Sequence, residues 1–198
     1  QSTAITCVKP SGTVSALNDT ASGIHPRHAP YYIRYVRNSN SDPVTHFLKD
    51  AGVPWEADVM DPNNTVCFKY PIKAPEGAIF KSELSALEHL ELWKVYQMFW
   101  CEHKPSVTIT VKEHEWMSVG AWVYDNFDWM SGISFLPDDG NHTYRQAPFT
   151  TCSREEYEAA AAAMPTHIDW EHLATFEVED TTTSSQELAC SGPNGCEI

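Results

Sequence analysis

Two small groups of residues, one near each end of the chain, have types and spacing that could do chemistry. The first is a loop of small residues after a short apolar run, and its members are Pro10, Ser11, Gly12, Thr13, Val14 and Ser15. Small side chains let backbone N–H groups approach an anion, and a helix beginning near Thr13 would add the partial positive charge of its first turn. The spacing of a Walker A loop is absent, so the loop predicts a different kind of phosphate site.

Cationic side chains follow this loop in the sequence. They are Arg27, His28, Arg34 and Arg37, and such groups commonly hold a phosphate. His25 and His28 lie in a proline-flanked loop, which favours a phosphate-side or structural role over metal binding, and we predict no metal site. An ordinary strand-to-helix turn also explains the loop, and from the loop alone this alternative stays open.

The second group is the cysteine pair Cys190 and Cys196. Gly, Pro and Asn lie between them, and a turn of such residues can bring the two Cα atoms to the ~5–6 Å separation of a disulfide. The preceding residues 177–187 are typical of a flexible segment. A tether of about 13 residues reaches roughly 20 Å on average and at most about 45 Å, so the dithiol could visit a buried site and return to solvent. A frayed terminus with two incidental thiols is the alternative.

Composition restricts the function classes. The 198 residues are 42% hydrophobic and include seven Trp, which predicts a folded body of one to one and a half domains. The net charge of −14 argues against a general nucleic-acid groove, so we expect no direct nucleic-acid partner. No apolar run approaches the ~20 residues of a membrane span. The other cysteines are scattered as in cytoplasmic proteins, and the start at Gln1 leads us to expect a piece of a longer protein.

Periodicity predicts a mixed α/β fold. We expect strands over residues 4–8, 65–70, 107–111 and 132–137 and helices over residues 42–51, 85–100, 113–127, 153–164 and 169–174. Residues 31–37 fit a strand or a helix. Ser85 and Ser153 each begin a capping-box spacing. The order strand, helix, strand over residues 107–137 indicates a βαβ unit with parallel strands, the second one short and buried.

Together these stretches resemble the catalytic subunit of the ribonucleotide reductases, specifically the adenosylcobalamin-dependent, monomeric class II branch that reduces ribonucleoside triphosphates. The matching stretches are residues 9–15, 22–27, 30–34, 132–137, 146–148, 186–190 and 196–198. They extend from end to end of the chain in one consistent order. The resemblance therefore implies the C-terminal part of a longer subunit.

The resemblance implies a fold and a set of roles. Residues 1–176 would form the C-terminal portion of a ten-stranded α/β barrel, with strands over residues 4–8, 107–111 and 132–136, and residues 177–198 a flexible redox-active tail. The loop Pro10 to Ser15 would hold the substrate phosphates. Cys190 and Cys196 would re-reduce the active-site disulfide and be reduced in turn by thioredoxin or glutaredoxin. The implied cofactor is adenosylcobalamin, and we locate none of its contacts in this segment.

The choice of class depends on Leu136 and Pro137. Class I relatives, which import their radical from a second subunit, carry adjacent tyrosines there, and Leu and Pro cannot relay a radical. A glycyl-radical (class III) enzyme would need a C-terminal glycine loop that is missing. The family's radical-bearing cysteine lies upstream of this segment, so we assign no catalytic residue here and expect the chain alone to be inactive. Thiols without a matching context are Cys7, Cys67, Cys101 and Cys152.

The tail departs slightly from the family pattern, because its two cysteines are six residues apart and the family spacing is one residue narrower. A second hypothesis is a thiol-redox or anion-binding module without nucleotide reductase activity. It predicts reversible tail oxidation that depends on neither nucleotide nor cobalamin. A thiol titration with and without nucleotide would separate the two hypotheses.

Overall fold

The computed structural model describes residues 2–138 and 145–178, and the chain divides into two compact units. Unit 1 comprises Gln1–Pro30 and Ala74–Thr143, and unit 2 comprises Tyr31–Lys73 and Tyr144–Ile198. Each unit is therefore built from two separate stretches of chain. The predicted tail dithiol, Cys190 and Cys196, lies outside the described residues.

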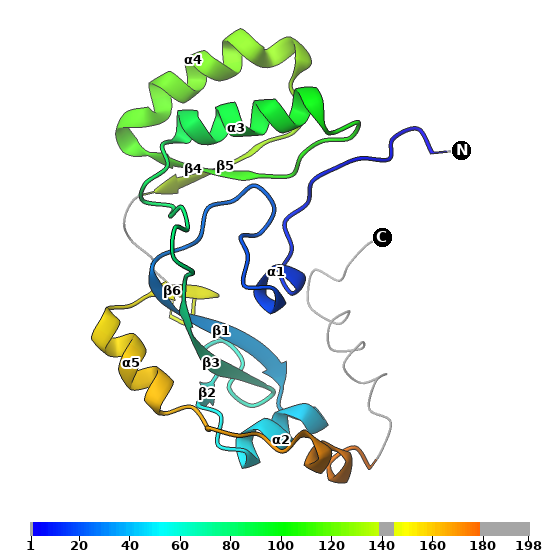
Figure 1. The fold of residues 1–198 in the computed structure, drawn as a ribbon, viewed down its shortest axis with the longest axis vertical. Helices are drawn as coiled ribbons and strands as arrows, with labels where there is room; N and C mark the ends of the chain where they lie inside the picture. The colour runs from blue at the N-terminus through cyan, green and yellow to red at the C-terminus, as the bar shows by residue number, and fades with distance from the viewer. Residues whose placement is uncertain (1, 139–144, 179–198) are drawn as a thin grey trace. The chain divides into compact units, whose positions relative to one another are not determined.

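In unit 1, a parallel pair of strands carries two helices on one side. Strand β4 (Thr108–Lys112) pairs with β5 (Ser134–Asp138) in parallel. Helix α4 (Trp116–Asn126) connects the two strands, and α3 (Ala86–Phe99) lies on the same side of the sheet (Figure 1). The predicted βαβ unit with parallel strands is thus confirmed. The shorter elements are α1 (Val14–Leu17) and the 3₁₀ helices η1 (Glu113–Glu115) and η2 (Phe127–Trp129).

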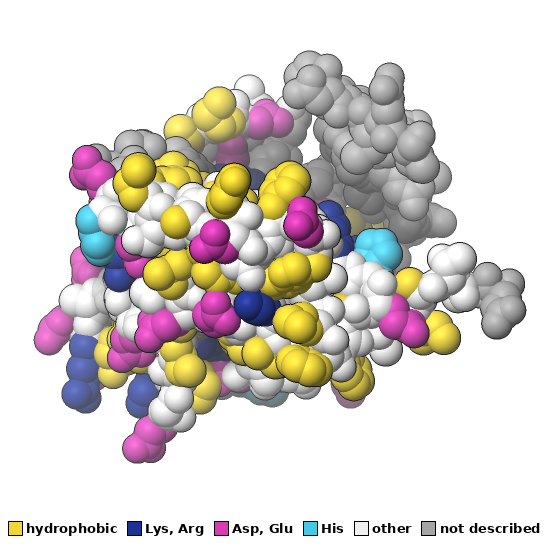
Figure 2. Space-filling view, turned by 90° about the horizontal axis from the view of Figure 1, so that it is seen from above, with side chains coloured by type: hydrophobic (Ala, Val, Ile, Leu, Met, Phe, Trp, Pro, Cys, Tyr) yellow, Lys and Arg dark blue, Asp and Glu magenta, His cyan; other side chains and the backbone are white. Residues whose placement is uncertain are grey.

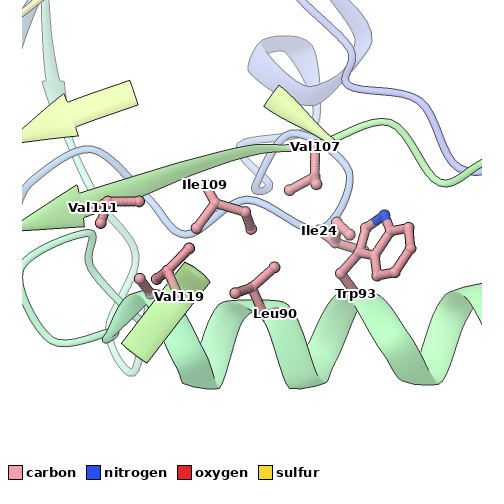
Figure 3. Close-up of a cluster of buried hydrophobic side chains, with 8 residues drawn as sticks. Ile24, Leu90, Trp93, Val107, Ile109, Val111 and Val119 are labelled. Carbon is pink, nitrogen blue, oxygen red and sulfur yellow. The ribbon is translucent and has the colours of Figure 1, made fainter. Parts of the chain in front are cut away.

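A cluster of buried apolar side chains joins these helices to the sheet (Figure 3). Ile109 and Val111 alternate along β4 and so face the same side, while Leu90 and Trp93 are one helical turn apart on α3. Burying a side chain of this size stabilises the fold by about 1.5–3 kcal/mol. The full cluster consists of Ile24, Ala86, Leu90, Trp93, Val107, Ile109, Val111 and Val119.

The strand predicted over residues 4–8 does not form. The N–H groups of Ile5 and Thr6 donate to the Glu102 carboxylate, at 2.6 and 3.3 Å, instead of to a neighbouring strand. The Val8 carbonyl oxygen accepts from Ser106 N–H. The segment is therefore held beside residues 102–106 by side-chain and isolated backbone bonds, and a regular ladder is missing.

The prediction of a buried second strand was also wrong. β5 forms where expected, but Leu136 is 51% exposed. The helices cover one face of the two-stranded sheet, and β5 has β4 on one edge only among the described residues. The apolar residues of β5 are therefore not buried in this segment.

The strands of unit 2 form one antiparallel sheet with the order β2-β3-β1-β6. Strands β1 (Tyr31–Ser39) and β3 (Thr65–Lys73) pair over their full length of 9 residues. The short strands β2 (Trp55–Ala57) and β6 (Phe149–Thr151) flank them. Residues 31–37, which fitted a strand or a helix, are therefore a strand.

Helices of unit 2 begin at the residues that the sequence indicates. Asp42 accepts the N–H of Val44 at 2.9 Å and caps α2 (Pro43–Asp50), and a capping box at Ser153 opens α5 (Arg154–Ala162). The helix expected over residues 169–174 is the 3₁₀ helix η3 (Trp170–Thr175). The buried cluster of this unit consists of Phe47, Leu48, Val53, Val66 and Phe68.

The surface is rich in acidic groups. On the face drawn in Figure 2, exposed hydrophobic side chains are interspersed with Asp and Glu, in keeping with the net charge of −14. Within residues 2–138 and 145–178, the helices are too short or too polar for any of them to pass through a lipid bilayer.

Candidate functional site

The predicted phosphate loop lies in unit 1, between the extended N-terminal segment and the one-turn helix α1. Helix α1 begins at Val14 with Thr13 as its N-cap residue, close to the predicted position. The Ser15 N–H donates to Ser11 Oγ at 3.1 Å, and Ser15 Oγ donates to the Ser11 carbonyl oxygen. These two bonds tie the end of the loop to its beginning.

The outer side of the loop is open. Gly12, Thr13 and Val14 are exposed, and a Cβ built on Gly12 meets no atom within 4 Å. Within the described residues, the N–H groups of Thr13 and Val14 have no hydrogen-bond acceptor. Adjacent N–H groups on an exposed bend that follows a glycine form a surface that a phosphate oxygen can approach.

The inner side of the loop is supported by a turn at Ser22 and Gly23. Ser22 Oγ accepts from Ser11 N–H at 2.8 Å and donates to the Ser11 carbonyl oxygen at 3.0 Å. Gly23 has φ +59°, and a Cβ there would lie 3.1 Å from the Lys9 carbonyl oxygen. Glycine alone combines that backbone conformation with so close an approach.

His25 extends this support to the sheet. Its Nε2 accepts from the Thr108 backbone N–H at 3.0 Å, so Nδ1 carries the proton and donates to the Ser22 carbonyl oxygen at 2.8 Å. His89, buried on α3, donates from Nε2 to the Ile24 carbonyl oxygen at 2.9 Å. Burial lowers the pKa of His89, which opposes the effect of that hydrogen bond. Sequence alone placed His25 in a turn but gave no sign of Thr108, 83 residues away.

The arginines expected to face a phosphate are engaged with protein carboxylates. Arg27, 8% exposed, pairs with Asp19 at 2.7 Å and donates to the Thr20 carbonyl oxygen at 2.8 Å. Arg37 lies in unit 2, as does Arg34, and pairs with Asp58 at 2.7 Å. Arg27 and Arg37 are therefore engaged by protein carboxylates, the exposed Asp19 and the buried Asp58, and are not free cations as the sequence suggested. Of the four predicted cationic residues, Arg27 and His28 lie in unit 1 with the loop.

Asp58 organises a second polar cluster, in unit 2. Burial alone would raise the pKa of Asp58, but four hydrogen bonds outweigh it and lower this pKa to about 2. Their donors are the N–H groups of Met60 and Asp61, the Cys67 thiol and the Arg37 guanidinium. Burial and the neighbouring Asp58 raise the pKa of Cys67 to about 11. Asp58 therefore stays ionised and Cys67 stays a neutral thiol, and a neutral thiol is a poor nucleophile.

Gln146, from the 146–148 motif, is buried in the same cluster. Its Oε1 accepts from Val59 N–H at 2.9 Å, and its Nε2 donates to Glu56 Oε1 at 2.7 Å and to the Ala57 carbonyl oxygen at 2.8 Å. Its backbone has φ +61°, a conformation that costs a residue other than glycine about 1–3 kcal/mol. The side-chain bonds offset that cost and fix this segment beside β2. The 146–148 motif is visible in the sequence, but this structural role of Gln146 is not.

Three of the four described cysteines, Cys67, Cys101 and Cys152, have the properties of structural thiols. Cys7, Cys67, Cys101 and Cys152 are free, and burial raises the pKa values of Cys101 and Cys152 as well as that of Cys67. A raised pKa lowers the fraction of reactive thiolate. No cluster of three or more His, Cys, Asp or Glu side chains suited to a metal ion occurs in residues 2–138 and 145–178.

Comparison with known proteins identifies the relatives of the chain. No family model matches it. Adenosylcobalamin-dependent ribonucleoside-triphosphate reductases from Lactobacillus gasseri and Lactobacillus acidophilus are 31% and 30% identical to it over 187 and 200 residues, which cover 92% and 97% of the chain. The reductase of the same name from Euglena gracilis is 28% identical over 192 residues. A solved B-12 dependent (class II) ribonucleotide reductase superposes with a TM-score of 0.72 over 86% of the chain, at 29% identity.

The chain is homologous to part of a class II ribonucleotide reductase. This relation confirms the resemblance that the residue motifs indicate, and the TM-score of 0.72 confirms a mixed α/β fold like that of the class II structure. The chain spans only about a quarter of the length of these reductases, between 24% and 26%. The class II reductases therefore carry most of their sequence outside the segment that corresponds to this chain.

Proposed function

We propose that the chain is the substrate-phosphate and tail-reductant portion of an enzyme that reduces ribonucleoside triphosphates to 2′-deoxyribonucleotides by thiyl-radical chemistry. The observation that supports this most is the alignment of 92–97% of the chain with adenosylcobalamin-dependent ribonucleoside-triphosphate reductases at 30–31% identity. In this proposal β4 and β5 belong to a ten-stranded barrel completed by the upstream part of the subunit. The chain is inactive alone, and the assembled enzyme acts in the cytoplasm.

The loop Pro10 to Ser15 is proposed to hold the substrate phosphates. Three observations support it: the unpaired N–H groups of Thr13 and Val14 among the described residues, the open space at Gly12, and the exposed Lys9 next to the loop. Helix α1 has only 4 residues, so its dipole is small and the loop amides carry the interaction. Substrate oxygens would replace water on these amides.

The loop is tested by titrating the chain with inorganic triphosphate and following the amide signals of Gly12, Thr13 and Val14 by NMR. Gly12→Ala adds a Cβ on the open side with no atom within 4 Å, so we expect the fold to be kept and binding to fall. Gly120→Ala, on α4 with equally open surroundings, is the matched control. Unchanged binding by Gly12→Ala would contradict the assignment.

Cys190 and Cys196 are proposed to carry electrons to the active site. Loss of the ribose 2′-hydroxyl as water consumes two electrons and two protons, which leaves a disulfide in the upstream part of the enzyme. A tail thiolate attacks one sulfur of that disulfide, and the second tail thiol then displaces the mixed disulfide, so that the tail is oxidised and the active site reduced. Thioredoxin or glutaredoxin returns two electrons to the tail by the same exchange.

Adenosylcobalamin, when bound to the whole enzyme, supplies the radical that this chemistry requires. The described residues offer it no identifiable site. Two buried polar side-chain atoms lack a hydrogen-bond partner there, Arg27 Nε and Thr45 Oγ1, and they belong to different units. Isolated atoms of this kind do not form the extended polar and apolar cradle that a corrin ring needs, so we assign the cofactor to the upstream part.

The whole proposal is tested by supplying the upstream part in trans and measuring 2′-deoxyribonucleotide formation. With thioredoxin as the reductant, the Cys190→Ser and Cys196→Ser double variant should lose multiple turnover, whereas a small dithiol that reaches the active site directly should restore it. Cys7→Ser, an exposed thiol, is the control. Equal turnover of wild type and double variant with thioredoxin alone would refute the tail assignment. If the oxidation of the tail cysteines depends on neither nucleotide nor cobalamin, the alternative hypothesis of a thiol-redox module is favoured.

A further inference from the structure

The phosphate loop is connected to strand β4 by a short chain of hydrogen bonds. Ser11 in the loop is bonded through both its N–H and its carbonyl oxygen to Ser22 Oγ. The Ser22 carbonyl oxygen accepts from His25 Nδ1, and His25 Nε2 accepts from Thr108 N–H at the first residue of β4. One imidazole, which acts as donor and acceptor at once, therefore links the loop to β4.

The backbone next to this imidazole is fixed by the core. Ile24 is 6% exposed within the apolar cluster, and its carbonyl oxygen accepts from the buried His89 (Figure 3 shows Ile24 beside Trp93). Residue 24 is thus held from the α3 side, and His25 supplies the contact of the turn with β4. A residue in such a position acts on the loop through geometry, without touching the ligand.

We propose that His25 is a positioning residue for the phosphate loop and that its protonation releases the loop from β4. This inference rests on the proposed function, since it concerns the loop Pro10 to Ser15. Protonated imidazole has N–H donors on both ring nitrogens and no acceptor. Nε2 would then present a hydrogen to the Thr108 N–H, and this bond would be lost.

Among residues 2–138 and 145–178, no carboxylate is hydrogen-bonded to His25 to compensate for that loss. From α3 it faces His89, with ring centroids 5.9 Å apart and planes at 82°, and from β4 it faces the backbone of Thr108. The nearby Arg27 is paired with Asp19. Release therefore weakens anion binding on acidification, whereas a histidine that merely attracts the anion would strengthen it. The two roles differ in sign.

The experiment measures the bond and the binding separately on the full chain. The bond is measured by the NMR scalar coupling between Thr108 N and His25 Nε2 and by exchange of the Thr108 amide hydrogen. Binding is measured with sulfate, because the charge of sulfate is constant between about pH 5 and pH 8, where histidines titrate. We expect the coupling while the imidazole is neutral and its loss on acidification, together with a roughly three- to tenfold weaker sulfate affinity, the range that one hydrogen bond gives.

Two substitutions separate positioning from charge. His25→Gln keeps an acceptor near the position of Nε2 and cannot be protonated, but it loses the Nδ1–H donor to the Ser22 carbonyl oxygen. We therefore expect binding weaker than that of the wild type at about pH 8, without pH dependence down to about pH 5. His25→Phe keeps a ring without the acceptor, so we expect weak binding at both pH values. His114→Gln, an exposed histidine of η1, is the matched control and should behave as wild type.

The outcomes distinguish this proposal from the phosphate assignment. Tighter or unchanged sulfate binding by the wild type on acidification would overturn the positioning role, and so would pH-dependent binding by His25→Gln. If His25→Phe does not fold, these two measurements still decide. If sulfate and inorganic triphosphate both fail to bind, the phosphate assignment fails. The Thr108–His25 coupling and the exchange of the Ser11 and Ser22 amide hydrogens then still show whether His25 holds the loop.

Discussion

Arg37 and Asp58 form a 2.7 Å ion pair in which the Asp58 side chain is 5% exposed and the Arg37 side chain 39%. Three further donors reach the same carboxylate, so its charge is fully hydrogen-bonded. Removing the Asp58 carboxylate leaves its buried donors without an acceptor, which costs about 1–3 kcal/mol. The cluster is thus a major stabilising element of unit 2.

Asp58→Asn tests this directly. We expect the free energy of unfolding of unit 2 to fall by about 3 kcal/mol, because an amide cannot accept all four donors and leaves Arg37 unpaired. The measurement is urea unfolding followed by the amide signals of β1 and β3. Asp50→Asn, whose side chain is 65% exposed at the end of α2, is the control and should change stability by less than about 0.5 kcal/mol. A similar loss in both variants would contradict the prediction.

The low pKa of Asp58 also predicts a pH dependence. This pKa is lowered from 3.8 to about 2 on folding, so the ionised carboxylate stabilises unit 2 at every pH above the unfolded value. As the pH falls through about 4 toward about 2, roughly 2 kcal/mol of stability should be lost. The difference in unfolding free energy between wild type and Asp58→Asn should shrink over that interval. A constant difference would be inconsistent with the assigned pKa.

Gln146 provides a test of backbone strain against hydrogen bonding. Gln146→Ala removes three side-chain hydrogen bonds and keeps φ +61°, so we expect a loss of about 2–3 kcal/mol. Gln146→Gly removes the same bonds but accepts the backbone conformation, so it should be more stable than the alanine variant by about 1 kcal/mol. Thermal unfolding of the three proteins gives the comparison. An alanine variant equal to the glycine variant would show that the strain is negligible.

The capping box of α3 predicts a smaller effect. Ser85 Oγ accepts from Glu88 N–H at 3.2 Å, and the Glu88 carboxylate accepts from Ser85 N–H at 2.8 Å. Ser85→Ala should lower the stability of unit 1 by about 1 kcal/mol. Ser82→Ala, an exposed serine before the helix, should be neutral. Equal losses would mean that the box does not cap the helix in solution.

The core of unit 1 predicts the largest effect of a single truncation. Leu90 is 0% exposed and packs between α3 and the sheet, so Leu90→Ala should cost about 3–5 kcal/mol through lost burial and a residual cavity. Leu17→Ala, at 86% exposure on α1, is the matched substitution and should change stability by less than about 0.5 kcal/mol. Calorimetric unfolding of both variants decides the matter.

Sequence reasoning recovered the parts of the fold that local patterns determine. The apolar spacing of α3, the alternation in β4 and the capping residues Asp42, Ser85 and Ser153 all act within a few neighbouring residues. Such signals do not reveal which segments meet. The pairing of β1 with β3 and β6 joins residues that are far apart in the chain, so neither the antiparallel sheet nor the choice of strand over helix for residues 31–37 could be derived.

The candidate site shows the same division. The small residues of the loop and the glycine of its supporting turn are visible in the sequence, because their lack of side chain is itself the signal. The partners are not. Arg37 has the residue type of a phosphate ligand but pairs with Asp58, and the apolar run over residues 4–8 is held by Glu102 instead of entering a sheet. Both outcomes depend on a carboxylate that only the folded chain brings near.

The connection between Pro30 and Ala74 has a consequence for the construction of the molecule. The Ala74 N–H donates to the Pro30 carbonyl oxygen at 2.9 Å, so the chain leaves unit 1 and re-enters it at neighbouring points. Residues 31–73 are therefore an insertion in unit 1, whose two flanking residues, Pro30 and Ala74, are hydrogen-bonded to each other. A tight turn joining residue 30 to residue 74 would preserve the route of unit 1, which makes that unit separable by excision as well as by truncation.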